Sequence, residues 1–202
     1  ECDSLKSVTL SNSLLSISDY TFSGCDSLQS VTLPKGLLSI GNYAFSYCTS
    51  LSSIIIPNSV TTIGDYAFDW CWLDEITLSD GLVTIGEGAF EGCSLTKVNI
   101  PKTVKKIGDN AFSGDFLSVV ITQDNVEIGD DAFGSDTVVF CPSTTKINNQ
   151  GAGVRYTDKT PIQITKAVQE ADGWYDEEDT NLYYIVPNET GDYYANVNYI
   201  FD

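Results

Sequence analysis

The chain has 202 residues, of which 42 % are hydrophobic, so it is long enough for one or two domains with a sizeable buried core. No stretch approaches the roughly 20 consecutive apolar residues that a membrane-spanning helix needs, which excludes direct membrane insertion of this segment. Its 10 basic and 28 acidic residues give a net charge of -18, which argues against nucleic acid and anionic membranes as partners.

A segment of about 22 residues recurs through residues 1–142. A period of this length is typical of a solenoid, in which neighbouring copies bury each other's apolar side chains. Each copy opens on alternating apolar residues, for example Val31 and Leu33, which predict one short strand per copy in a parallel sheet. One phenylalanine per copy marks the period: Phe22, Phe45, Phe68, Phe90, Phe112 and Phe133.

The second half of each copy is expected to return the chain to the start of the next strand. A proline often ends the strand, and a second apolar stretch up to an isoleucine, such as Ile40, predicts a turn or a short irregular strand. Glycine and an acid or amide follow, as in Gly41 and Asn42, and we expect the glycine to permit an unusual backbone angle. The side chain of Asn42 is expected to cap a short helix or 3-10 turn.

The pattern "YAFSYCTSLSSIIIPNSVTTIG" (residues 43–64) resembles the BspA-like leucine-rich repeat family, also called the Treponema pallidum type. The resemblance covers residues 1–142 and implies a solenoid of leucine-rich repeats whose parallel β-sheet lines a concave face, with short helical, 3-10 or irregular returning segments. It also implies an extracellular or cell-surface protein, since the family occurs largely in such proteins and is implicated in adhesion to host or neighbouring-cell molecules.

Departures from the pattern gather where the solenoid is expected to end. The sixth copy is shortened, holds Asp115 in its cysteine position, and has Thr122 in place of an inward aliphatic residue. Residues 143–158 are predicted to form a capping segment, with a short helix and a strand that cover the last coil. Since the chain begins inside a repeat without an N-terminal cap, we expect it to be a piece of a longer protein.

Five cysteines share one column of the repeat, just ahead of its recurrent leucine, while Cys141 takes an aliphatic position of a strand. Equivalent residues of neighbouring coils have parallel Cβ vectors, whereas a disulfide needs converging Cβ atoms and zinc needs four ligands around one point. We therefore predict a structural ladder of buried free thiols, in preference to disulfides or a metal site. The column comprises Cys2, Cys25, Cys48, Cys71 and Cys93.

The residues needed for most catalytic sites are missing from the chain. Without a single histidine there is no Ser–His–Asp or Cys–His system and no imidazole metal ligand. No phosphate-binding or dinucleotide-binding glycine motif occurs either. A column of acids could be read as a cation-binding row, but capping of successive turns explains it without a ligand. It comprises Asp19, Asp65, Glu87, Asp109 and Asp130. We predict no enzyme, no cofactor and no metal.

Aromatic residues of the returning segments form the candidate partner-binding patch. They are Tyr20, Tyr43, Tyr47, Tyr66, Trp70 and Trp72. Such a patch suits a protein or the faces of sugar rings, and the alternative is that the rings only pack over the coil edges. The outward strand positions are mostly small hydroxyls and lack the Trp, Tyr and Arg typical of binding hot spots. These positions are Ser7, Thr9, Ser30, Thr32, Ser53, Ile55, Glu75, Thr77, Lys97 and Asn99.

Residues 159–202 differ sharply in composition and are rich in tyrosine. The alternating stretches "NLYYIVP" and "YYANVNYIF" predict a β-hairpin, which is either a small C-terminal β appendage or the start of a further domain. The string "GWY" followed by "LYYIV" is faintly similar to the aromatic hairpins of cell-wall-binding and glucan-binding modules.

These observations favour a non-enzymatic binding module of a surface or secreted protein, engaged in protein–protein interaction or adhesion. The partner is expected to be a protein of a host or neighbouring cell, and a glycan remains an alternative. A second hypothesis is a structural spacer that displays other domains. A third is carbohydrate or cell-wall binding through the C-terminal aromatic hairpin.

Overall fold

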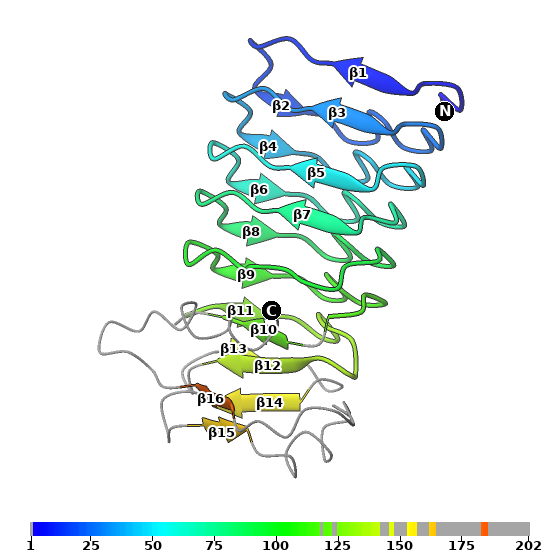
Figure 1. The fold of residues 1–202 in the computed structure, drawn as a ribbon. Helices are drawn as coiled ribbons and strands as arrows, with labels where there is room; N and C mark the ends of the chain where they lie inside the picture. The colour runs from blue at the N-terminus through cyan, green and yellow to red at the C-terminus, as the bar shows by residue number, and fades with distance from the viewer. Residues whose placement is uncertain are drawn as a thin grey trace.

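The computed structural model describes residues 2–117, 119–122, 125–141, 146–147, 153–156, 162–164 and 183–185. The repeats form a β-solenoid in which each coil lies against the one before it (Figure 1). The residues described contain strands and turns but no helix, so the irregular alternative for the returning segments holds. In this part of the chain, no helix has the length and hydropathy to cross a bilayer.

The first face of the solenoid carries the strand predicted for each repeat. Its strands are β1 (Ser7–Thr9), β3 (Ser30–Thr32), β5 (Ser53–Ile55), β7 (Glu75–Thr77), β10 (Val119–Ile121), β12 (Val138–Cys141) and β14 (Gly153–Tyr156). Equivalent residues pair in parallel, with Val8 opposite Val31 and Ile54 opposite Ile76. The predicted parallel pairing is therefore confirmed.

The fifth repeat departs from this rule, because residues 97–99 form no strand. Val98 and Ile100 are still buried, so the side chains keep the expected alternation. The outward pair of this coil is Lys97 and Asn99, whereas the equivalent pairs in the four coils before it each include a threonine or isoleucine. Since β-branched residues favour the extended backbone, the prediction of a strand here is wrong for a local reason of composition.

The second face is a continuous seven-stranded parallel sheet of two-residue strands in chain order. The isoleucine that ends the second apolar stretch lies in this sheet, and Ile17, Ile40 and Ile63 stand in register. Of the two predicted alternatives, the short second strand is therefore the one that forms. The strands are β2 (Ser16–Ile17), β4 (Ser39–Ile40), β6 (Thr62–Ile63), β8 (Thr84–Ile85), β9 (Lys106–Ile107), β11 (Glu127–Ile128) and β13 (Lys146–Ile147).

Stacked phenylalanine rings fill the core between the two faces. Consecutive ring centroids lie 5.2–5.4 Å apart. Phe45, Phe68 and Phe90 are fully buried, as is the alanine that precedes each of them. The small alanine leaves room for the ring to turn inward. The stack removes a large apolar surface from water in every coil and ties the coils into one cooperative core.

The glycine before each returning segment has a different role from the predicted one. The φ angle of Gly64 is not positive, and an added Cβ would lie only 2.8 Å from the backbone nitrogen of Asn42 in the preceding coil. Close approach of two backbones therefore requires this glycine. The following Asx side chain caps no helix; instead the Oδ1 atom of Asn42 accepts a hydrogen bond from the backbone N–H of Asp65, at 2.8 Å, in the next coil.

Beyond the sixth repeat, the chain continues both sheets. Lys146–Ile147, within the segment predicted to hold a short helix and a strand, forms β13, because Ile147 takes the next place in the isoleucine column opposite Ile128. β14 pairs in parallel with β12, which agrees with the predicted strand of the capping segment. β15 (Ile162–Ile164) pairs antiparallel with β16 (Tyr183–Ile185). The predicted second hairpin strand, within residues 193–201, lies outside the described residues.

Candidate functional site

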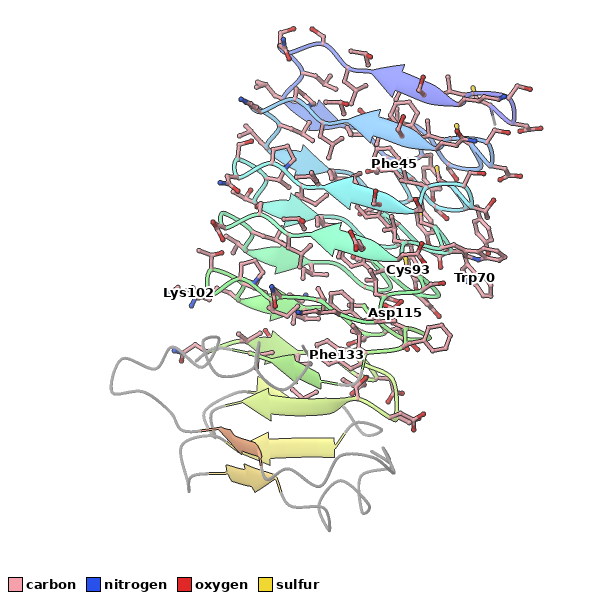
Figure 2. The ribbon with its side chains drawn as sticks, in the orientation of Figure 1. Phe45, Trp70, Cys93, Lys102, Asp115 and Phe133 are labelled. Atoms are coloured by element: carbon pink, nitrogen blue, oxygen red, sulfur yellow. The ribbon has the colours of Figure 1, made fainter. Side chains whose placement is uncertain are left out.

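The six aromatic residues of the candidate patch belong to the returning segments at one edge of the solenoid. Figure 2 shows Trp70 at this edge and Lys102 at the opposite one. Tyr43 and Tyr66 are half-buried. The other four are exposed: Tyr20 by 61 %, Tyr47 by 51 %, Trp70 by 48 % and Trp72 by 56 %. We refer to these six residues as the aromatic edge.

All six residues of the aromatic edge have left-handed backbone angles, with φ between 52° and 60°. This conformation is rare for bulky side chains and costs roughly 1–2 kcal/mol per residue. Other coils place residues that adopt it readily at the positions of Tyr66 and Trp70, including Gly88, Asn110 and Gly92. The fold therefore requires left-handed geometry at these positions but does not require an aromatic ring.

The tyrosines of the aromatic edge stack face to face along the solenoid. The ring centroids of Tyr20 and Tyr43 lie 4.8 Å apart, and those of Tyr43 and Tyr66 lie 5.0 Å apart. Beyond Tyr66 the stack ends on Gly88, where a Cβ atom would collide with the tyrosine ring. The flat faces of Tyr43 and Tyr66 are thus covered within the protein. Stacking of a sugar ring on them is sterically blocked.

Trp70 ends a second column of the aromatic edge in a similar way. An added Cβ on Gly92 would lie 3.1–3.2 Å from atoms of the indole ring, so the ring lies over the backbone of the next coil. The backbone N–H of Trp70 donates to the carbonyl of Glu91, at 2.8 Å. The indole ring is held against the backbone of the next coil and still exposes about half of its surface.

Carboxylates lie directly beside the aromatic edge. The hydroxyl of Tyr66 donates to Oε1 of Glu87 at 2.6 Å, and this bond, together with burial, holds the pKa of Tyr66 well above its usual range. Asp69, which directly precedes Trp70 in the chain, is buried. Burial and the charge of Glu91 raise the pKa of Asp69 to about 6. Burial and the charge of Glu87 also raise the pKa of Glu91. At neutral pH the site is therefore aromatic and negatively charged.

The acid column belongs to the scaffold. The Oδ1 atoms of Asp19, Asp65 and Asp109 each accept the backbone N–H of the equivalent residue in the next coil, at 2.8–2.9 Å. A hollow of about 410 Å³ lies beside this column over β8, β9 and β11. Within the residues described, no group of three or more acids or cysteines is arranged to hold a metal ion. The acids act as links between coils.

Four of the column cysteines are buried free thiols, namely Cys25, Cys48, Cys71 and Cys93. The S–H of Cys71 donates to the carbonyl of Phe45 in the preceding coil, at 2.9 Å, and Cys48 and Cys93 make equivalent bonds. Burial raises the pKa of Cys93 to about 12, so this thiol stays protonated as a donor. Cys2 is exposed, against the expectation of a fully buried ladder, because no described coil covers it.

A family model described as "BspA type Leucine rich repeat region (6 copies)" matches residues 1–117 and 39–151. The chain belongs to this family. A comparison with curated proteins finds no match. The repeat seen in the sequence, the parallel coils and the family match agree with one another, so the predicted fold class is confirmed.

Two solved leucine-rich repeat structures are similar to this BspA-type chain. One is the Treponema pallidum leucine rich repeat protein, with 28 % identity, a TM-score of 0.57, and coverage of 63 % of this chain and 74 % of that one. The other is a leucine-rich repeat protein from Bacteroides ovatus, with 29 % identity, a TM-score of 0.54, and coverage of 76 % of this chain and 46 % of that one. The chain therefore matches less than half of the Bacteroides protein.

Sequence reasoning missed three features of the aromatic edge. Phe116 lies in the same column as Trp72, two coils further on, and is 69 % exposed, so this edge carries a further exposed ring. The buried carboxyl of Asp69 was also missed, as were the two glycines, Gly88 and Gly92, on which the columns of stacked rings end. A comparison of each column from coil to coil would have found them, because an aromatic residue alternating with glycine indicates a position with left-handed backbone.

Proposed function

We propose that this BspA-type chain is a non-enzymatic protein-binding module of a surface or secreted protein, and that the aromatic edge is its contact surface. The observation that carries the proposal is the placing of six aromatic residues at left-handed backbone positions, several of which other coils fill with glycine or asparagine. A residue whose backbone is strained, although the fold does not require that residue type there, is a candidate for a functional role. Exposed Trp and Tyr residues are also the commonest anchors of protein interfaces.

The first face of the solenoid, which carries β1, β3, β5 and β7 and is called the strand face from here on, supports this choice by contrast. Its outward residues are mainly serine and threonine, and its large apolar residue, Ile55, is 74 % exposed but has threonine as its register partner, Thr77. Small hydroxyls bury little apolar area and provide few anchors. In a protein of this repeat family, adhesion to a host or neighbouring-cell protein through the edge fits better than adhesion through the strand face.

The proposal is tested by replacing aromatic residues with the residues that other coils of this chain have at the same positions. Tyr43→Asn, Tyr66→Gly and Trp70→Gly place residues found at the equivalent positions of other coils, so the backbone geometry is preserved. The combined variant is screened beside the wild-type chain on an array of purified surface proteins. Loss of binding by the variant is expected, with retention by Ile55→Thr as the matched control. Unchanged binding by the combined variant would refute the role of the edge.

The alternative of a structural spacer also has an observation in its favour. The tyrosine stack ties three consecutive coils together, and such ring pairs contribute about 0.5–1.5 kcal/mol each. A spacer predicts that the combined variant loses stability but leaves attachment of the parent protein to its target cells unchanged. Attachment and free energy of unfolding, measured on the same variant, separate the two functions.

A further inference from the structure

One edge of the solenoid, the edge with the aromatic rings, contains acids but no bases. Each returning segment begins at the recurrent glycine or its serine equivalent and ends at the recurrent leucine or one residue beyond it; the last segment, which lacks this leucine, ends at Thr137. Together these segments form the turn edge. They comprise residues 18–28, 41–51, 64–74, 86–95, 108–117 and 129–137. The turn edge contains twelve acids and neither lysine nor arginine. The acids are Asp19, Asp26, Asp65, Asp69, Asp74, Glu87, Glu91, Asp109, Asp115, Asp130, Asp131 and Asp136.

The lysines of residues 2–141 all lie in other parts of the coils. Lys6 precedes β1, Lys97 takes an outward position of the first face, and Lys106 lies in β9. The others, Lys35, Lys102 and Lys105, lie in the connections from the first face to the second sheet, at the opposite edge, where Figure 2 shows Lys102. Evenly mixed charges would have placed some lysines beside the aromatic rings. Their absence from the whole turn edge leaves the carboxylates near the rings without a cation from their own segment.

From this arrangement, we propose that the aromatic edge binds an arginine- or lysine-rich segment of a partner protein. The inference rests on the proposed function and adds the chemistry of the partner. A basic partner segment complements this edge, since acids and aromatic rings are combined on one surface from which bases are missing. A glycan or a second copy of this acidic chain lacks the complementary charge.

The geometry of the edge suits cationic side chains in two ways. Arginine and lysine are attracted to exposed tryptophan and tyrosine rings, and Trp70 and Trp72 each expose about half of their surface. A guanidinium group next to these rings can also donate hydrogen bonds to carboxylates, and Glu87 and Glu91 lie in the adjacent coil. The partly buried carboxyl of Glu91 has a raised pKa, so a bound cation would stabilise its charged form.

Long-range attraction adds to these contacts. A net charge of -18 steers basic partners toward the molecule, and this effect weakens as salt is added. General attraction would act equally on acids anywhere on the surface, whereas a specific site depends on the acids beside the rings. The test therefore compares acids at the edge with acids elsewhere at the same net charge.

The experiment measures binding of a fluorescent peptide of alternating arginine and serine to the intact chain, with a citrulline and serine peptide as the neutral control. Three variants are compared: Glu87→Gln with Glu91→Gln, Glu75→Gln with Asp80→Asn, and Tyr43→Asn with Tyr66→Gly and Trp70→Gly. The first two remove the same charge, but Glu75 and Asp80 lie outside the turn edge and are exposed. We expect the edge pair and the aromatic variant each to weaken arginine binding about ten-fold, and the control pair about two-fold at most.

Each other outcome overturns the inference. Equal weakening by the two acid pairs would mean general charge attraction, and equal binding of the citrulline peptide would mean that cations are not recognised. Binding of a neutral glycan that is lost in the aromatic variant would make the occupant a sugar. If the arginine peptide does not bind but a neutral or acidic surface protein binds through the same rings, this inference fails while the proposed function stands.

Discussion

Asp115 is the place where a single substitution should stabilise the protein most. It occupies the cysteine position of the shortened sixth copy, within the returning segment 108–117, where the preceding coils bury a thiol. Its Oδ1 atom accepts the backbone N–H of Leu95 at 3.1 Å, while its Oδ2 atom is buried without a hydrogen-bond partner among the described residues. Burial raises the pKa of this carboxyl to about 8. Asp115→Asn keeps the acceptor for Leu95 and removes the ionisable group.

The magnitude follows from proton linkage. Because the pKa of the folded state lies above the unfolded value of 3.8, the folded chain binds the extra proton between about pH 4 and pH 8. The stability contributed by the protonated carboxyl is complete below pH 4 and is lost as the pH rises to 8. Each pKa unit corresponds to about 1.4 kcal/mol, so the upper limit of the loss at pH 7 is about 4 kcal/mol. The Asp115→Asn chain has no such loss.

Urea unfolding followed by tryptophan fluorescence, at a series of pH values from 4 to 8, measures this difference. The Asp115→Asn chain should match the wild type near pH 4 and become more stable by an increasing amount up to pH 8. Asp74→Asn, at an exposed acid of the turn edge, is the control and should show little difference at any pH. A constant difference between Asp115→Asn and the wild type across this range would refute the reasoning.

Three further substitutions test the scaffold, each by its free energy of unfolding in urea. Thr122→Val should stabilise by about 1–3 kcal/mol, because the hydroxyl of Thr122 is buried without a partner among the described residues; destabilisation would contradict this. Gly88→Ala should destabilise strongly because its Cβ would collide with the ring of Tyr66, whereas Gly36→Ala, with open space around it, should not; equal effects would contradict this. Trp70→Gly should change stability by no more than about 1 kcal/mol, since relief of backbone strain offsets the lost ring contacts; a larger loss would mean a structural role.

Much of the fold could be predicted because each structural feature recurs in the sequence. The alternation of Val31 and Leu33 gave the strand, and the recurrent phenylalanines gave the stacked core. Two-residue strands such as Ser39–Ile40 could only be left open, because two residues show no periodicity. The missing strand at residues 97–99 depends on the weak strand preference of Lys97 and Asn99, which the apolar pattern of the coil does not reveal.

The candidate site could be predicted in part. The aromatic residues stand out in the sequence, but the backbone N–H groups of left-handed residues such as Tyr43 and Tyr47 donate to carbonyls of the next coil, which are contacts that no single repeat contains. The role of Gly41 was misjudged for the same reason, since the atoms that exclude a side chain there belong to Ser18 and Asp19 of the preceding coil. The pairing of Tyr66 with Glu87 also joins two coils. The repeat pattern predicts the structural features that all coils share, whereas the candidate site consists of residues that differ from one coil to the next.

The most direct test of the aromatic edge as a binding surface is a two-dimensional NMR titration of the ¹⁵N-labelled chain with the arginine and serine peptide. We predict that the indole N–H resonances of Trp70 and Trp72 and the amide resonances of the adjoining returning segments shift with increasing peptide. The amides of β5 and β7 on the strand face should stay in place. Shifts confined to the strand face, or spread evenly over the acidic surface, would contradict the proposal.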